Sequence, residues 1–312
     1  MNKSAIFYHP AFLLHDTGPH PETAARLNSI TGYLKKAPFA SQLAWPSFNP
    51  ASYEDITAIH SAGHFSHVRN VCQTGGGYLD ADTVVCQDSW EAALLAAGAA
   101  CSAAEGALGG EHKTAFCAVR PPGHHAEAAR AMGFCLFNNI AIAARKVTRG
   151  GQARRVAIID FDVHHGNGTQ HAFYDDPSVY FVSLHLAGHY PGTGWEGETG
   201  EGEGAGTTMN LPMEAGSGDA DYLYLLERHV LPALDKYRPE LILLSAGFDA
   251  HVADPLGGMA ISTEGYYQIT RAITGLADEV CGGRVVSVLE GGYNITALGE
   301  SARAHVRALL GM

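Results

Sequence analysis

The amino-acid sequence predicts a single α/β domain over residues 1–312, with a mainly parallel central sheet flanked by helices. Short apolar runs alternate with helical patterns along the whole chain, which is typical of βαβ units. The apolar runs lack the polar–apolar alternation of half-exposed strands, which indicates strands covered on both faces. No Pro- or Ser-rich linker and no repeat of roughly 20–50 residues divides the chain.

Six apolar segments are expected to form strands: residues 5–8, 115–119, 156–161, 179–184, 241–245 and 285–289. Helical patterns lie between and after them, at residues 21–36, 89–108, 139–147, 220–237, 263–277 and 295–310. Ser89 is the expected N-cap of the second helix. That helix is Ala-rich and contains Gly98 and Glu105, which favours a buried helix over a membrane span. The Gly-rich stretch 192–206 is the longest irregular segment, and such loops are usually functional or mobile.

The charge composition disfavours a nucleic-acid-binding protein. The chain has 20 Lys and Arg against 32 Asp and Glu, a formal net charge of −12, whereas nucleic-acid-binding domains carry a basic patch. An acidic surface is compatible with a cationic substrate, although many cytoplasmic proteins are simply acidic. The six cysteines form no C-x-x-C pair and the chain start lacks the apolar core of a signal peptide. We therefore expect a cytoplasmic protein with no disulfide framework and no membrane partner.

Three polar residues stand at alternating positions where the strand 156–161 ends. They are Asp160, Asp162 and His164. Side chains two residues apart on an extended chain point the same way, so a carboxylate and an imidazole converge just past the strand. That pair suits a divalent metal of the zinc type. By itself, a D-x-H pair is more often a hydrogen-bonded cluster that caps a strand.

Three other strand ends carry residues of related chemistry. Asp249 follows the strand 241–245 and could be a third metal ligand, which would leave a coordination position open as in catalytic zinc sites. His124 and His125 follow a rigid Arg-Pro-Pro-Gly turn and could take a proton from water and pass it to a leaving amine. Tyr293 follows a Gly-Gly pair, and its phenol could donate a hydrogen bond to an oxyanion.

The conjunction of these motifs carries more weight than any one of them, because each alone could be a turn cap or a surface pair. Parallel sheets place their sites outside the carboxyl ends of the strands. Here four strand ends each provide a residue type that metal-assisted amide hydrolysis needs. The sequence therefore predicts a metal-dependent amide hydrolase.

At these residues the chain resembles the histone deacetylase and acetylpolyamine amidohydrolase family, in a class II-like, prokaryotic form. The resemblance covers about residues 9–294, with the motifs in the family's order. The motifs are His20-Pro21-Glu22 with Arg26, then residues 120–126, 133–139, 160–168, 182–185, 191–194, 254–258 and 291–293. The resemblance implies the arginase–deacetylase fold and zinc-dependent removal of acyl groups from acyl-lysine side chains.

The resemblance also implies a catalytic group around one zinc ion. Asp162, His164 and Asp249 match the zinc ligands. His125 matches the general base and acid, and Tyr293 matches the residue that polarises the substrate carbonyl.

Further matched residues support this group. Asp160 matches the partner of His124, which is itself the electrostatic partner of His125. Asn167 matches the partner of His125, and a potassium ion is implied near Asp160 and Ser183. The tunnel for an aliphatic side chain is matched by Gly133, Phe134, Tyr190 and Leu256.

Three positions depart from the family's patterns. Asn167 stands where class I members carry Asp, and a neutral partner should leave the pKa of His125 lower than an Asp would. Tyr190 replaces the usual Phe of the tunnel wall. Leu256 stands where polyamine-selective relatives can carry an acidic residue, which favours an acyl-lysine substrate over a polycation.

Two other functions stay open on the sequence. One is hydrolysis of acetylpolyamines or other small acylated amines. The other is an acyl-group binder without turnover, which is disfavoured because a binder needs neither a base nor an oxyanion donor. The ligand set also accepts iron or cobalt, and the sequence is compatible with a homo-oligomer.

Overall fold

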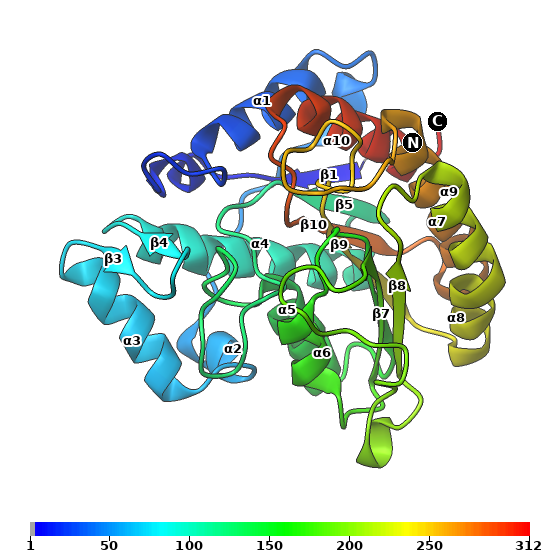
Figure 1. The fold of residues 1–312 in the computed structure, drawn as a ribbon, viewed down its shortest axis with the longest axis horizontal. Helices are drawn as coiled ribbons and strands as arrows, with labels where there is room; N and C mark the ends of the chain where they lie inside the picture. Colours follow the sequence, from blue (N-terminus) through cyan, green and yellow to red (C-terminus); the bar gives the residue numbers. More distant parts are fainter. Residues whose placement is uncertain (1–3) are drawn as a thin grey trace.

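The protein is described by a computed structural model over residues 4–312. Its strands are β1 (Ser4–Phe7), β2 (Leu43–Ala44), β3 (Gly77–Tyr78), β4 (Val84–Val85), β5 (Thr114–Cys117), β6 (Val156–Asp160), β7 (Val179–Leu186), β8 (Thr208–Met213), β9 (Leu241–Ala246) and β10 (Val285–Leu289). Across residues 4–312, eight of them form one sheet in the order β2-β1-β5-β10-β9-β6-β7-β8 (Figure 1). Every neighbouring pair in this sheet is parallel. The predicted single α/β domain with a mainly parallel sheet is confirmed.

The strand predictions are right for the interior of the sheet and incomplete at its edges. All six predicted strands are present, with ends that differ by at most two residues. The two edge strands, β2 and β8, were not predicted: β2 has two residues, and β8 is only partly buried and contains Pro212. Edge strands pack against fewer neighbours, so their sequences carry a weaker apolar signal.

The helices are α1 (Ala24–Lys35), α2 (Tyr53–Thr57), α3 (Ala62–Gln73), α4 (Ser89–Gly109), α5 (Asn139–Arg149), α6 (Asn167–Phe173), α7 (Asp219–Leu225), α8 (Leu231–Tyr237), α9 (Thr263–Cys281) and α10 (Ile295–Leu309). The helix predicted at 220–237 is divided by a π-helical turn at Leu226–Val230. The short helices α2 and α6, and the longer α3, were not predicted. The loop between β7 and β8 is irregular, as expected, apart from one 3₁₀ turn at Gly202–Gly204.

Helices cover both faces of the main sheet. Figure 1 shows α1 and α10 on one side, with α9 beside α10, and α4 and α5 on the other side. The interior strands are consequently buried along their whole length, for example Val285–Leu289. This double cover explains the continuous apolar runs of the sequence.

Helix α4 is largely buried inside the protein. In the described part of the chain it is the one helix long and apolar enough to cross a membrane, yet 72% of its most apolar window is buried inside the protein. The expectation of a buried helix is confirmed. The N-cap prediction is wrong by one residue: Asp88 precedes the helix, and Ser89 is its first residue. The buried Ser89 hydroxyl instead accepts from the N–H of Cys86 and hydrogen-bonds with His15.

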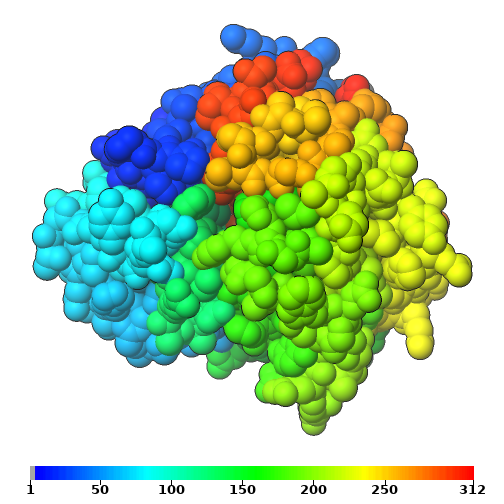
Figure 2. Space-filling view, viewed as in Figure 1, coloured from blue at the N-terminus to red at the C-terminus, as the bar shows by residue number. Residues whose placement is uncertain are grey.

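The strand order brings the chemical motifs together. The four loops with catalytic-type residues follow β5, β10, β9 and β6, which are four consecutive strands of the sheet. Their carboxyl ends therefore share one edge. In the space-filling view, segments far apart in sequence, drawn in cyan, green and orange, meet on the same face of the molecule (Figure 2).

Candidate active site

Two aspartates and a histidine form a compact group at the carboxyl ends of β6 and β9. Atoms of Asp162, His164 and Asp249 that can bind a metal all lie within 4.8 Å of one another. His164 Nδ1 lies 2.9 Å from Asp162 Oδ1 and 3.3 Å from Asp249 Oδ2. Both carboxylates are fully buried. The three residues expected to share one cation are thus within reach of a single ion.

The group has the properties of a cation site. Asp249 Oδ2 is buried and has no hydrogen-bond partner of good geometry, and an unpaired buried carboxylate oxygen is costly unless a cation meets it. The other oxygens are fixed by backbone N–H groups: Val163 donates to Asp249 Oδ1 at 2.9 Å and Gly291 to Asp162 Oδ2 at 2.8 Å. A Cβ at position 291 would overlap Asp249 Oδ2, so only glycine allows this approach. One imidazole and two carboxylates are ligands that zinc accepts.

Two imidazoles lie side by side next to this group, each held by a different partner. The rings of His124 and His125 lie 3.9 Å apart between centroids. His124 Nδ1 lies 2.9 Å from Asp160 Oδ2, and His125 Nδ1 lies 2.8 Å from Asn167 Oδ1. The amide nitrogen of Asn167 donates to Glu127 Oε1 at 2.7 Å. This fixes the amide so that its oxygen accepts from His125 Nδ1, which leaves the lone pair on His125 Nε2.

The two histidines have opposite pKa shifts. Burial alone would lower the pKa of His124, but the carboxylates of Asp160 and Asp162 outweigh it and raise that pKa to about 10. Burial, and then the positive charge on His124, lowers the pKa of His125 well below its usual value. Near neutral pH, His124 is therefore cationic and His125 is neutral and able to accept a proton.

A cavity of about 200 Å³ opens onto this group. Its walls are formed by Asp82, His125, Gly133, Phe134, His164, His189, Tyr190, Leu256 and Tyr293. All four predicted tunnel residues are among them. Gly133 has a φ of +55°, and a Cβ there would lie 2.5 Å from His125 Cδ2. The glycine thus lets the wall pass directly against the imidazole.

Tyr293 borders the same cavity. Its ring lies edge-on to Phe134, with centroids 5.8 Å apart. Burial raises the pKa of the Tyr293 phenol well above its usual value, so the hydroxyl keeps its proton and can act as a hydrogen-bond donor.

Sequence reasoning missed two wall residues, Asp82 and His189. His189 stacks on His164 with centroids 4.9 Å apart, and its Nε2 lies 3.0 Å from the carbonyl oxygen of Leu256. The contact of His189 with His164 could have been inferred from the sequence, because His189 directly precedes the predicted tunnel residue Tyr190. Asp82 follows no predicted strand, and only the fold brings it to the cavity.

A buried ionic network supports the loop that carries Tyr293. Arg26 donates to the carbonyl oxygens of Gly292 at 2.7 Å and Glu290 at 2.5 Å, and its guanidinium lies 4.9 Å from the centre of the Tyr293 ring. Glu22 accepts from Arg26 at 3.0 Å and from Arg120 at 2.6 Å. Opposing the effect of burial, these two arginines lower the pKa of Glu22 to about 2. The sequence marked Glu22 and Arg26 as motif residues but assigned them no role.

The potassium prediction rests on Asp160 and Ser183, which are register partners on β6 and β7 and are both fully buried. Their side chains have protein partners: Asp160 Oδ1 accepts from the N–H of Asp162 at 3.1 Å, and Ser183 Oγ lies 2.9 Å from His185 Nδ1. The two residues are adjacent as expected, and potassium binding stays a prediction.

Known proteins resemble this chain over nearly its whole length. The histone deacetylase domain family matches residues 20–309. Histone deacetylase 14, chloroplastic, of Arabidopsis thaliana is 39% identical, with 98% of this chain and 76% of that protein covered. The histone deacetylase-like amidohydrolase of Pseudomonas aeruginosa is 37% identical, with 94% of this chain and 82% of that protein covered. The crystal structure of the HDA15 HD domain matches with a TM-score of 0.93 at 37% identity, covering 99% of this chain and 91% of that chain.

Proposed function

Because this chain belongs to the histone deacetylase family, we propose that it is a zinc-dependent deacetylase that removes acetyl groups from acyl-lysine side chains. Family membership supports an amide-hydrolysing deacetylase. The zinc ion and the acyl-lysine substrate are the parts that we add, and both are argued from the cavity and its residues.

One observation carries the proposal: three metal-ligand atoms within 4.8 Å of one another lie beside a neutral imidazole and a phenol that border the same cavity. The ligands would be Asp162, His164 and Asp249. When bound there, a zinc ion supplies a Lewis acid that polarises a carbonyl and lowers the pKa of water.

The chain's own residues supply the proton transfers. His125 Nε2 takes a proton from the attacking water and later delivers it to the departing amine, while Asn167 keeps the ring in the required tautomer. His124 stays cationic through Asp160 and adds positive charge next to the developing negative charge. The Tyr293 hydroxyl donates to the carbonyl oxygen as that charge develops.

The walls support a substrate whose acylated amine is carried on a long, largely apolar side chain. Phe134 and Tyr190 provide aromatic surface, and Leu256 is 37% exposed at the cavity. A methylene chain of the lysine type can be buried between them. Asp82 also borders the cavity, and its carboxylate favours a cationic substrate. This single residue keeps acetylated polyamines as the second candidate.

The test compares substrates on one preparation. The purified protein is expected to contain about one zinc ion per chain and to hydrolyse acetyl-lysine peptides faster than acetylated polyamines. A chelator should abolish turnover and added zinc should restore it. A preference for polyamines would favour the second candidate, and failure to hydrolyse either amide with metal bound would contradict the proposal.

A further inference from the structure

Glu290 is a fully buried carboxylate that the proposed reaction does not use. It follows β10 directly and is 0% exposed. Its Oε2 accepts from two consecutive backbone N–H groups, those of Gly123 at 2.7 Å and His124 at 3.1 Å. Oε1 lies 3.5 Å from the hydroxyl of Ser245. Carboxylates with backbone donors of this kind fix the conformation of the donating segment.

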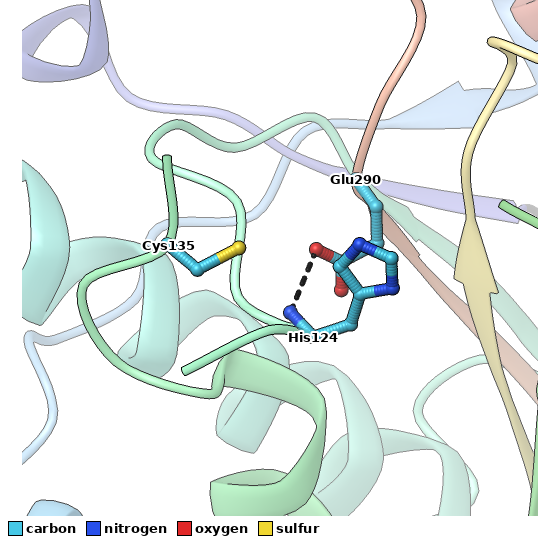
Figure 3. Close-up of side chains that lie close together, drawn as sticks. All are labelled: His124, Cys135 and Glu290. Carbon is cyan, nitrogen blue, oxygen red and sulfur yellow. Dashed lines mark hydrogen bonds between the residues drawn. The ribbon is translucent and has the colours of Figure 1, made fainter. Parts of the chain in front are cut away.

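Figure 3 shows Glu290, His124 and Cys135 converging from three separate loops. Potential ligand atoms of the three lie within 4.8 Å of one another, which raises the question of a second metal. Burial raises the pKa of the Cys135 thiol well above its usual value, which disfavours the thiolate form that binds metals. The thiol lies 3.3 Å from the carbonyl oxygen of Gly133, and His124 Nδ1 is occupied by Asp160. The arrangement therefore supports His124 and is not suited to hold an ion.

The main chain around Glu290 is held by hydrogen bonds to Arg26 and to the predicted metal ligand Asp162. Arg26 donates to the Glu290 carbonyl oxygen, and the N–H of the next residue, Gly291, donates to Asp162 Oδ2. Tyr293 follows two residues later. One residue thus joins the turn that presents the paired imidazoles to the loop that presents the phenol and orients a metal ligand.

We propose that Glu290 is a positioning residue. By accepting hydrogen bonds from the N–H groups of Gly123 and His124, it holds His124 and His125 in position relative to Tyr293. The inference rests on the proposed function. Small displacements of reacting groups are costly in such sites, because a misplacement of about 1 Å can lower the rate roughly a hundredfold.

Two substitutions separate the hydrogen bonds from the charge. Glu290→Ala removes the acceptor, so kcat for an acetyl-lysine peptide should fall roughly ten- to a hundredfold, with KM and zinc content nearly unchanged. Glu290→Gln keeps an oxygen of the same reach, and its kcat should stay within about threefold of the unsubstituted protein. If Glu290→Ala does not fold, Glu290→Asp, which draws the oxygens back from both N–H groups, takes its place.

Glu240→Ala is the matched control. Glu240 Oε2 also accepts from two consecutive backbone N–H groups, those of Arg154 and Arg155, but it precedes β9 at the other end of the sheet. This variant should lose stability without losing kcat.

Imidazole signals of nitrogen-labelled histidine provide a readout that does not need turnover. Signals of His124 and His125 should shift in Glu290→Ala and be preserved in Glu290→Gln and Glu240→Ala. The inference would be overturned if the histidine signals and kcat were unchanged in Glu290→Ala. It would also be overturned if Glu290→Gln or the control Glu240→Ala lost as much kcat as Glu290→Ala. A wild-type protein inactive on all amides would contradict the proposed function alone, because the histidine signals decide the role of Glu290 independently.

Discussion

At the residue scale, the chemistry of the site depends on two neighbouring histidines in opposite protonation states. His124 and His125 are adjacent and their rings are in contact, yet the first faces a carboxylate and the second faces an amide oxygen. The carboxylate stabilises a proton on His124, and the resulting charge, added to burial, removes the proton from His125. The hydrogen bond to Asn167 raises the pKa of His125, but burial and the charge on His124 outweigh it. That an Asp at position 167 would give a higher pKa stays a prediction.

Replacing Tyr293 by Phe removes only the phenol oxygen. We expect the Tyr293→Phe variant to retain zinc and to lose about 3 kcal/mol of transition-state stabilisation, which is roughly a hundredfold in kcat. Steady-state kinetics on an acetyl-lysine peptide, together with metal analysis, measure both effects. Full activity in this variant would contradict the assignment of Tyr293 as oxyanion donor.

Replacing Asp249 by Ala removes the carboxylate oxygen that has no hydrogen-bond partner. We expect the Asp249→Ala variant to be purified with far less than one zinc per chain, because only Asp162 and His164 remain as ligands. Asp235→Ala is a suitable control, since Asp235 lies on α8 and forms an exposed ion pair with Arg238. Stoichiometric zinc in Asp249→Ala would count against this ligand set.

At the element scale, small residues let α4 approach the backbone of a neighbouring segment. Gly98 lies in the middle of the helix, where a Cβ would overlap the backbone oxygen of Asn49. The N–H of Ala51 donates to the carbonyl oxygen of Leu94 at 2.9 Å, one helical turn earlier. The close contact is therefore fixed by a hydrogen bond and cannot widen freely. Gly98, which in the sequence favoured a buried helix over a membrane span, is needed for tertiary packing.

The Gly98→Ala substitution tests this packing. Although Ala has the higher helix propensity, we expect this variant to lose about 1–3 kcal/mol in the free energy of unfolding, because overpacking forces the backbones apart. Gly109→Ala, in the same helix with open space around it, should be neutral or slightly stabilising. Denaturant titration of both variants measures the difference, and equal stabilities would disprove the packing role.

At the scale of the whole molecule, the interior holds several neutral histidines. His305 hydrogen-bonds with Thr270 and Ser287 between α9, α10 and β10, and burial lowers its pKa to about 3. Burial likewise lowers the pKa of His60 to about 3 and that of His15 to about 4. In the unfolded chain these rings have ordinary pKa values near 6.5. At these three histidines the unfolded state therefore binds more protons than the folded state between about pH 6.5 and the folded-state pKa values.

The stability of the protein should accordingly fall as the pH is lowered below about 6.5, and the fall should continue down to the folded-state pKa values. His305→Gln isolates one contribution: its unfolding free energy should depend less steeply on pH, by roughly one proton at pH 4–5. Denaturant titrations of both proteins across this range give the slopes. Identical slopes would show that His305 does not take up a proton on unfolding.

The class of fold, the interior strands and most residues of the candidate site could be predicted from the amino-acid sequence. These features are local: a doubly covered strand needs a continuous apolar run, and a strand end with Asp, His or Tyr is visible in a few neighbouring positions. Asp162, His164 and Asp249 could therefore be selected from their places after strands, and the family resemblance gave each of them a role.

The supporting roles of Glu290 and Arg26 became visible in the tertiary structure alone. Glu290 and Arg26 lie 264 positions apart and Glu290 and Gly123 lie 167 apart, so no local pattern connects them. A buried charge is stable only where the fold places hydrogen-bonding or oppositely charged groups beside it. Here those groups lie on segments that are brought together because the order of the strands in the sheet differs from their order in the chain. Local propensity selected the elements, whereas long-range burial and hydrogen bonding set the positions of Asp82, Glu290 and the edge strands.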